Sequence, residues 1–233
     1  MKKYKLLKDQ AIILKGRTLY RILAIKEIVD EKGQSIVKSG SLGGYVQSEK
    51  NLSQTGLSWI SDNGKVYDYA VVQDDAQVSG ESEVYDNAVI FGHASVSGKT
   101  VVHNNAKVYG NSKISDAEIY GYSRVYDKAE VYDNAAIFDH ACVYGHAKVC
   151  RNAWVCDNAM IYDHAIVTDA KVYDNALVYG HAKVYGSAHI YDDAQVYGHA
   201  EVRENSQVYE CAQVCGNAKI FGFEPVNGHS IKN

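Results

Sequence analysis

Val or Ile recurs at every sixth position along most of the chain, from Ile60 to Ile220, and a small residue, usually Ala, stands two positions before it. The unit reads Val/Ile-Tyr-Asp/Gly-Asn/His-Ala-x, and all 28 units begin with Val or Ile. A six-residue period matches neither a helix nor the plain two-residue alternation of a strand. It predicts an all-β solenoid, a β-helix in which each unit supplies one short strand and one corner.

The order of residues within a unit predicts how the coil is built. In the stretch Ala-x-Val-Tyr, Ala and Val point inward, whereas x and Tyr point outward. The corner residues, Asp or Gly followed by Asn or His, tolerate the backbone geometry of tight turns. Three units per coil would form a triangular prism, and 28 units then predict roughly nine coils and a rod about 45 Å long at about 4.8 Å per coil. The only proline, Pro225, lies after the repeat, as expected for strands that need every N–H donor.

Two units, 114–118 and 167–171, have five residues because each lacks one corner residue. They are nine units apart, which corresponds to three whole coils if a coil contains three units. Both shortened corners are therefore predicted to lie on the same edge of the prism.

Three regions follow from the extent of the repeat. Residues 59–221 form the β-helix, and residues 222–233 form a C-terminal tail. Residues 1–58 do not follow the repeat and are predicted to form a small β module, with short strands at 4–7, 12–14, 19–28 and 35–37. This module would cap the first coil, because an uncovered coil exposes a row of unpaired backbone groups.

Charge and cysteine content indicate which partners and which cellular compartment to expect. Residues 1–58 hold 11 Lys and Arg against 5 Asp and Glu, whereas the rest holds 13 basic and 23 acidic residues. The head is thus basic and the rod acidic, and either could be solvated surface or meet a charged partner. No apolar run of signal-peptide or membrane-spanning length follows Met1. We therefore expect no membrane partner. Five cysteines, an odd number without CxxC spacing, favour a reduced, cytoplasmic protein.

The repeat resembles the hexapeptide-repeat left-handed β-helix superfamily, whose best-known members are trimeric acyltransferases. The segment from Val37 to Val46, with Leu42-Gly43-Gly44, and the residues Asn51-Leu52-Ser53 and Trp59-Ile60-Ser61-Asp62 are similar to the start of the bacterial YdcK-like proteins. Those combine a small N-terminal β module with a long left-handed β-helix and carry a putative-transferase label. The resemblance covers essentially the whole chain, and it implies left-handed winding.

Placing the outward residues on three faces singles out one face. Its outward positions hold a continuous aromatic column with apolar residues beside it: Phe91, Tyr109, Tyr126, Tyr144, Met160, Tyr162, Leu177, Tyr179 and Tyr197, with Cys142 widening the strip. The column could serve only to stack neighbouring coils. An exposed apolar strip of this length also marks a contact surface, and we expect this face to pair with another subunit. A neighbouring face begins with Ser61, Ser79, Ser97 and Ser115 and is expected to be solvated.

Two edges of the prism carry repeated titratable residues. The edge after the aromatic column holds His93, His146, His164, His181 and His199. These could serve the turn in solvent, form a pH-sensitive interface or bind a metal or anion, although a row of imidazoles is not a closed tetrahedral zinc site. Another edge holds Asp68, Asp86, Asp139, Asp157, Asp174 and Asp192. Turn chemistry accounts for these; cation binding or mimicry of nucleic-acid phosphates is the alternative, and we expect no nucleic-acid partner.

Two functions remain open. The regular repeat favours a non-catalytic scaffold that self-associates as a dimer or trimer, or binds a protein partner, through the aromatic face without a cofactor or metal, since enzymes usually interrupt their own pattern at the active site. The resemblance implies the alternative, an acyltransferase with acetyl-CoA or an acyl carrier as donor. In that case His146 or His164 would be the general base between subunits.

Overall fold

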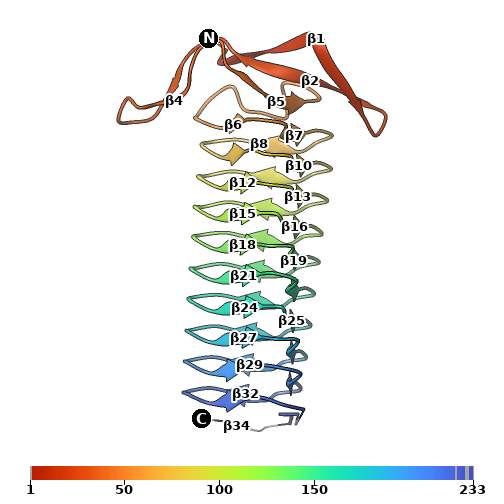
Figure 1. Cartoon of the computed structure of the whole chain (residues 1–233), viewed down its shortest axis with the longest axis vertical. Helices are drawn as coiled ribbons and strands as arrows, with labels where there is room; N and C mark the ends of the chain where they lie inside the picture. The colour runs from red at the N-terminus through yellow and green to blue at the C-terminus, as the bar shows by residue number, and fades with distance from the viewer. Residues whose placement is uncertain (1, 224, 229–230, 233) are drawn as a thin grey trace.

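The protein is described by a computed structural model, and the description covers residues 2–223, 225–228 and 231–232. It is a rod of about ten stacked parallel coils with an antiparallel strand module at its N-terminal end (Figure 1). The described residues contain no helix, and therefore none that could span a membrane. The all-β solenoid predicted from the repeat is confirmed.

Three parallel sheets run the length of the rod, and each coil adds one strand to each sheet. The first sheet forms the side that we call the aromatic face: β8 (Val71–Val72), β11 (Val89–Ile90), β14 (Lys107–Val108), β17 (Arg124–Val125), β20 (Cys142–Val143), β23 (Met160–Ile161), β26 (Leu177–Val178), β29 (Gln195–Val196), β32 (Gln213–Val214) and β34 (Ile231–Lys232).

The second sheet forms what we call the Trp154 face: β5 (Leu42–Val46), β7 (Lys65–Val66), β10 (Glu83–Val84), β13 (Val101–Val102), β16 (Glu118–Ile119), β19 (Ala136–Ile137), β22 (Trp154–Val155), β25 (Lys171–Val172), β28 (His189–Ile190) and β31 (Gln207–Val208). The third face consists of β6 (Trp59–Ile60), β9 (Gln77–Val78), β12 (Ser95–Ser97), β15 (Lys113–Ser115), β18 (Glu130–Tyr132), β21 (Lys148–Cys150), β24 (Ile166–Thr168), β27 (Lys183–Tyr185), β30 (Glu201–Val202) and β33 (Lys219–Ile220).

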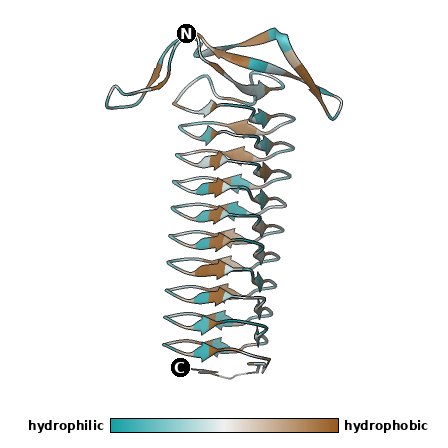
Figure 2. Cartoon of the chain, viewed as in Figure 1, coloured by the Kyte–Doolittle hydropathy of each residue, from teal (hydrophilic) through white to brown (hydrophobic). Residues whose placement is uncertain are grey.

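The interior of the rod follows the predicted alternation. Ala141 and Val143 are completely buried, whereas Cys142 and Tyr144 between and after them face outward and are partly exposed. Hydrophobic residues accordingly lie along the strands of the rod (Figure 2). The coils are joined by backbone hydrogen bonds such as that from the N–H of Tyr144 to the carbonyl of Ile161, 3.0 Å.

The two shortened units lie on one edge, as predicted. Each joins the third face to the Trp154 face, between β15 and β16 and between β24 and β25, and β24 is the third rung after β15 in the same sheet. Three units per coil is therefore the correct count. The rod also extends beyond the repeat: Leu52 bridges to Val72 at one end, and Val226 bridges to Val208 at the other.

The N-terminal module continues one sheet of the rod. A hairpin of β1 (Tyr4–Leu14) and β2 (Arg17–Ala24) turns at Lys15 and Gly16, both with positive φ, and β2 pairs antiparallel with β5, which pairs parallel with β7. A second hairpin joins β3 (Ile28–Val29) to β4 (Ser35–Val37). The two short strands predicted at 4–7 and 12–14 are thus one strand, with an irregularity between Leu7 and Ala11.

A buried lysine connects this module to the loop above the first coil. The Nζ of Lys3 donates to the carbonyl of Ser58 at 2.7 Å and to its hydroxyl at 3.1 Å, and it lies 3.3 Å from the carbonyl of Thr55. Loss of hydration lowers the pKa of Lys3 to about 8, and the nearby charge of Lys26 contributes in the same direction. Tyr4 beside it is buried and donates its hydroxyl to the carbonyl of Leu52 at 2.7 Å.

The edge that carries the repeated aspartates, from Asp68 to Asp192, provides a test of what stabilises the corners. Asp174 has φ of 55°, donates its N–H to the carboxylate of Asp157, and accepts the N–H of Asp192 at 3.2 Å. We predict that Asp174→Ala lowers the free energy of unfolding by about 2 kcal/mol, because it loses a hydrogen bond and forces a left-handed backbone on Ala. Asp174→Gly should cost less than Asp174→Ala, and Asp174→Asn least, in denaturant-induced unfolding. Equal costs for Gly and Ala would show that the backbone conformation carries no penalty.

Candidate functional site

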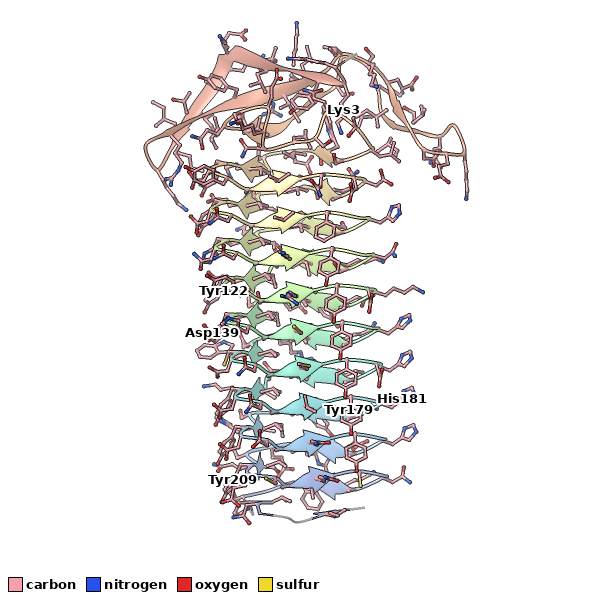
Figure 3. All side chains as sticks on the ribbon, turned by 180° about the vertical axis from the view of Figure 1, so that it is seen from behind. Lys3, Tyr122, Asp139, Tyr179, His181 and Tyr209 are labelled. Atoms are coloured by element: carbon pink, nitrogen blue, oxygen red, sulfur yellow. The ribbon has the colours of Figure 1, made fainter. Side chains whose placement is uncertain are left out.

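The aromatic face carries an uninterrupted stack of seven rings, as the sequence predicted. Successive ring centroids are 4.7 to 5.0 Å apart and the planes differ by at most 7°. Figure 3 shows the column that contains Tyr179 running along the rod. We call the aromatic ladder the residues Phe91, Tyr109, Tyr126, Tyr144, Tyr162, Tyr179 and Tyr197. Each ring covers its neighbours' faces and leaves its edges at the surface.

An apolar strip lies beside the middle of this ladder. Cys142, Met160 and Leu177 occupy the same position on three consecutive rungs of the sheet. Met160 is 39% exposed. The two rungs before them carry Lys107 and Arg124, which separate this strip from Val71 and Val89 on the first two rungs of the face.

Four of the five predicted histidines form a second stack at the neighbouring edge. His146, His164, His181 and His199 are exposed, with ring centroids 4.9 to 5.0 Å apart. His181 projects from the edge next to Tyr179 (Figure 3). His93 lies apart from this stack, with its Nδ1 3.4 Å from the carboxylate of Asp75. Within the described part of the chain, no group of three or more His, Cys, Asp or Glu side chains could hold a metal ion.

The six aspartates of the opposite edge all serve the turn. Each has φ between 54° and 56°, a conformation that Asp adopts more readily than most residues. Several carboxylates also accept a backbone N–H from the next coil, as Asp192 does from Glu210 at 3.0 Å. Asp68 in addition pairs with Arg17 of the N-terminal module, at 2.5 Å. Turn chemistry therefore accounts for this edge.

A second column of stacked rings lies on the Trp154 face and was missed at the sequence level. It contains Tyr67, Tyr85, His103, Tyr120 and Phe138, and after an interruption at Cys156 it continues with Tyr173, Tyr191 and Tyr209. The signal was present, because these residues occupy the same unit position as the aromatic ladder. At the interruption Trp154 packs edge-on against Phe138, with centroids 6.3 Å apart.

Comparison with known proteins identifies no family model that matches this chain and no matching curated protein. The fold and the side-chain geometry are therefore the observations from which a function can be argued.

Burial within the ladder raises the pKa of most of its phenols. Loss of hydration, followed by neighbouring phenols and carboxylates, raises the pKa of Tyr162 to about 12, and burial likewise raises that of Tyr126 to about 12. A raised pKa stabilises the fold fully below the unfolded value of about 10, and this stabilisation is lost as the pH rises toward the folded value.

We therefore predict that the free energy of unfolding falls between about pH 10 and 12. Absorbance titration of tyrosinate should show late-ionising phenols in the folded protein and ionisation near pH 10 in denaturant. Tyr162→Phe keeps the stacked ring and should reduce the amplitude of the late phase. Superimposable titrations of the folded and unfolded chain would contradict the prediction.

Proposed function

We propose that the protein is a YdcK-like hexapeptide-repeat scaffold with left-handed winding that self-associates through its aromatic face and performs no catalysis. The observation that supports this is the apolar strip of Cys142, Met160 and Leu177 beside the aromatic ladder. The seven rings span six intervals of 4.7 to 5.0 Å, about 29 Å in all. A ring column of this length on a flat sheet, with an apolar strip beside its middle, fits the core of a subunit interface.

Stacking alone does not account for this strip. The second column of rings, on the Trp154 face, stacks with the same spacing, although the position beside its rings holds Lys65, Glu83, Glu118 and Lys171 as well as Val101, Ala136 and Trp154. The stability of the coils thus tolerates charged neighbours. Apolar neighbours on the aromatic face need a different reason, and burial against a second copy supplies one.

The order of residues along the face favours an antiparallel dimer. A two-fold axis perpendicular to the rod at the Met160 rung would place Cys142 against Leu177 of the second copy, and Arg124 against Gln195. A two-fold axis parallel to the rod would instead place Arg124 against Arg124 and Lys107 against Lys107. The antiparallel arrangement joins apolar to apolar residues and avoids repulsion between like charges.

We predict that Tyr144→Glu combined with Tyr162→Glu converts the wild-type dimer to a monomer in light scattering after gel filtration, because a buried carboxylate without a partner destabilises an interface. Tyr173→Glu combined with Tyr191→Glu is the matched control, since these rings stack 5.0 Å apart on the Trp154 face. The control pair should leave the dimer intact. A wild-type monomer, or equal loss of the dimer in both pairs, would contradict the proposal.

The acyltransferase alternative has a separate test. A scaffold should show no rise in melting temperature with acetyl-CoA, whereas a specific binder is stabilised in proportion to ligand concentration. A rise that disappears in His146→Ala or His164→Ala would instead support acyl transfer with one of these histidines as the general base.

A further inference from the structure

The Trp154 face contains a surface depression of about 490 Å³ that neither stacking nor self-association explains. Val101, Glu118, Ala136 and Trp154 lie on four consecutive rungs along it. Tyr120 and Phe138 line one side, and Lys99, Asp116 and Asn134 line the edge of the prism on the other. The depression thus combines aromatic rings with two carboxylates, an amide and an ammonium group.

The shortened unit 114–118 and a small side chain together open this space. The unit lacks one corner residue, so Asp116 alone makes the turn, with φ of 50° and its carboxylate held by the N–H of Lys99 at 2.9 Å. On the next rung Ala136 adds only a methyl group, and Ala117 is also small. One wall of the recess is Trp154, which remains 46% exposed.

The second shortened unit, 167–171, is an internal comparison. Its corner residue Asp169 is bound by Arg151 at 3.3 Å and by the side-chain amide of Asn152 at 3.1 Å. The rung equivalent to Ala136 carries His189, which packs edge-on against Tyr173. Side chains therefore fill the space beside the second shortened unit. The depression beside the first shortened unit stays open and has a lining of mixed polarity that a ligand could contact.

The orientation of the rings limits the kind of ligand. Tyr120 and Phe138 stack on each other with planes 2° apart, so they offer mainly their electropositive edges. Lys171 Nζ already lies over the Trp154 ring, 4.6 Å from its centroid, and Lys99 lines the recess. A cationic ligand is disfavoured by these groups, and a phosphate-bearing ligand by Asp116 and Glu118.

We propose that this depression binds one neutral pyranose unit of a glycan, with a face of the sugar against the Trp154 indole. Sugar C–H bonds are weakly positive and suit the electronegative face of an indole. The hydroxyl groups of a sugar both donate and accept hydrogen bonds, and the rim supplies acceptors in Asp116 and Glu118, a donor in Lys99 and both in Asn134. The site lies on a different face from the proposed dimer seam, so the two proposals can fail separately.

Titration calorimetry of the full-length protein with cellotetraose, maltotetraose and chitotetraose tests this inference. At least one of the sugars should bind saturably with a dissociation constant of about 1 mM, so that the site is mostly occupied at about 10 mM sugar. The same sugar should change the tryptophan fluorescence of the wild type, because Trp154 is exposed and the other tryptophan, Trp59, is 3% exposed.

Two substitutions locate the site. Trp154→Ala should weaken binding in calorimetry by about tenfold or more, and Ala136→Leu should do the same by filling the recess. Both positions face outward, so an unchanged circular dichroism spectrum and melting temperature would show that the rod remains folded. Tyr69→Ala is the matched control, because Tyr69 is 81% exposed and lies outside the depression; it should bind like the wild type. Absence of binding by all three sugars, or binding that survives both substitutions, would overturn the proposal.

Discussion

The hydrogen bonds between successive coils determine where every outward side chain lies. Each rung is held to the next by N–H to carbonyl bonds, such as that from Cys142 to Ala159 at 3.0 Å, and the paired residues are 17 or 18 positions apart in the sequence. A residue type that recurs at this interval therefore becomes a column on the surface. The phenols, imidazoles and corner aspartates all form columns for this one reason.

A column has two separate consequences, and the two ring columns help to distinguish them. Stacked rings stabilise neighbouring coils wherever they occur, which is why both columns persist with centroids about 5 Å apart. The residues beside a column need not be of one type for the rings to stack. Lys171 is accepted next to Tyr173, whereas Met160 and Leu177 stand next to Tyr162 and Tyr179, so the proposed association rests on the neighbours of the rings and not on the stacking.

Much of the fold was predictable because the repeat contains no insertions. Counting units placed both shortened corners on one edge and aligned the aromatic ladder correctly. The rungs at the two ends were less evident, since Ile60 lies eight positions after Leu52, and Val226, although six positions after Ile220, stands among residues that no longer match the repeat unit. The column that begins with Tyr67 is predictable from the same period, because its rings directly follow the Val and Ile residues of the Trp154 face.

The depression beside Trp154 depends on a different kind of information. The period predicts that residues 118, 136 and 154 share a column, but not that an indole will stand beside a methyl group and leave an open recess. That result depends on side-chain size at Ala136 and on the interruption of the ring column at Cys156, where Trp154 turns edge-on to Phe138. The backbone has the same shortened corner at Asp169, but there the side chains of Arg151 and Asn152 bind the Asp169 carboxylate. Stacking between equivalent residues stabilises successive coils of the rod. Residues that differ from the rest of their column are not explained by this stabilisation, and such residues make the surroundings of the two shortened units different.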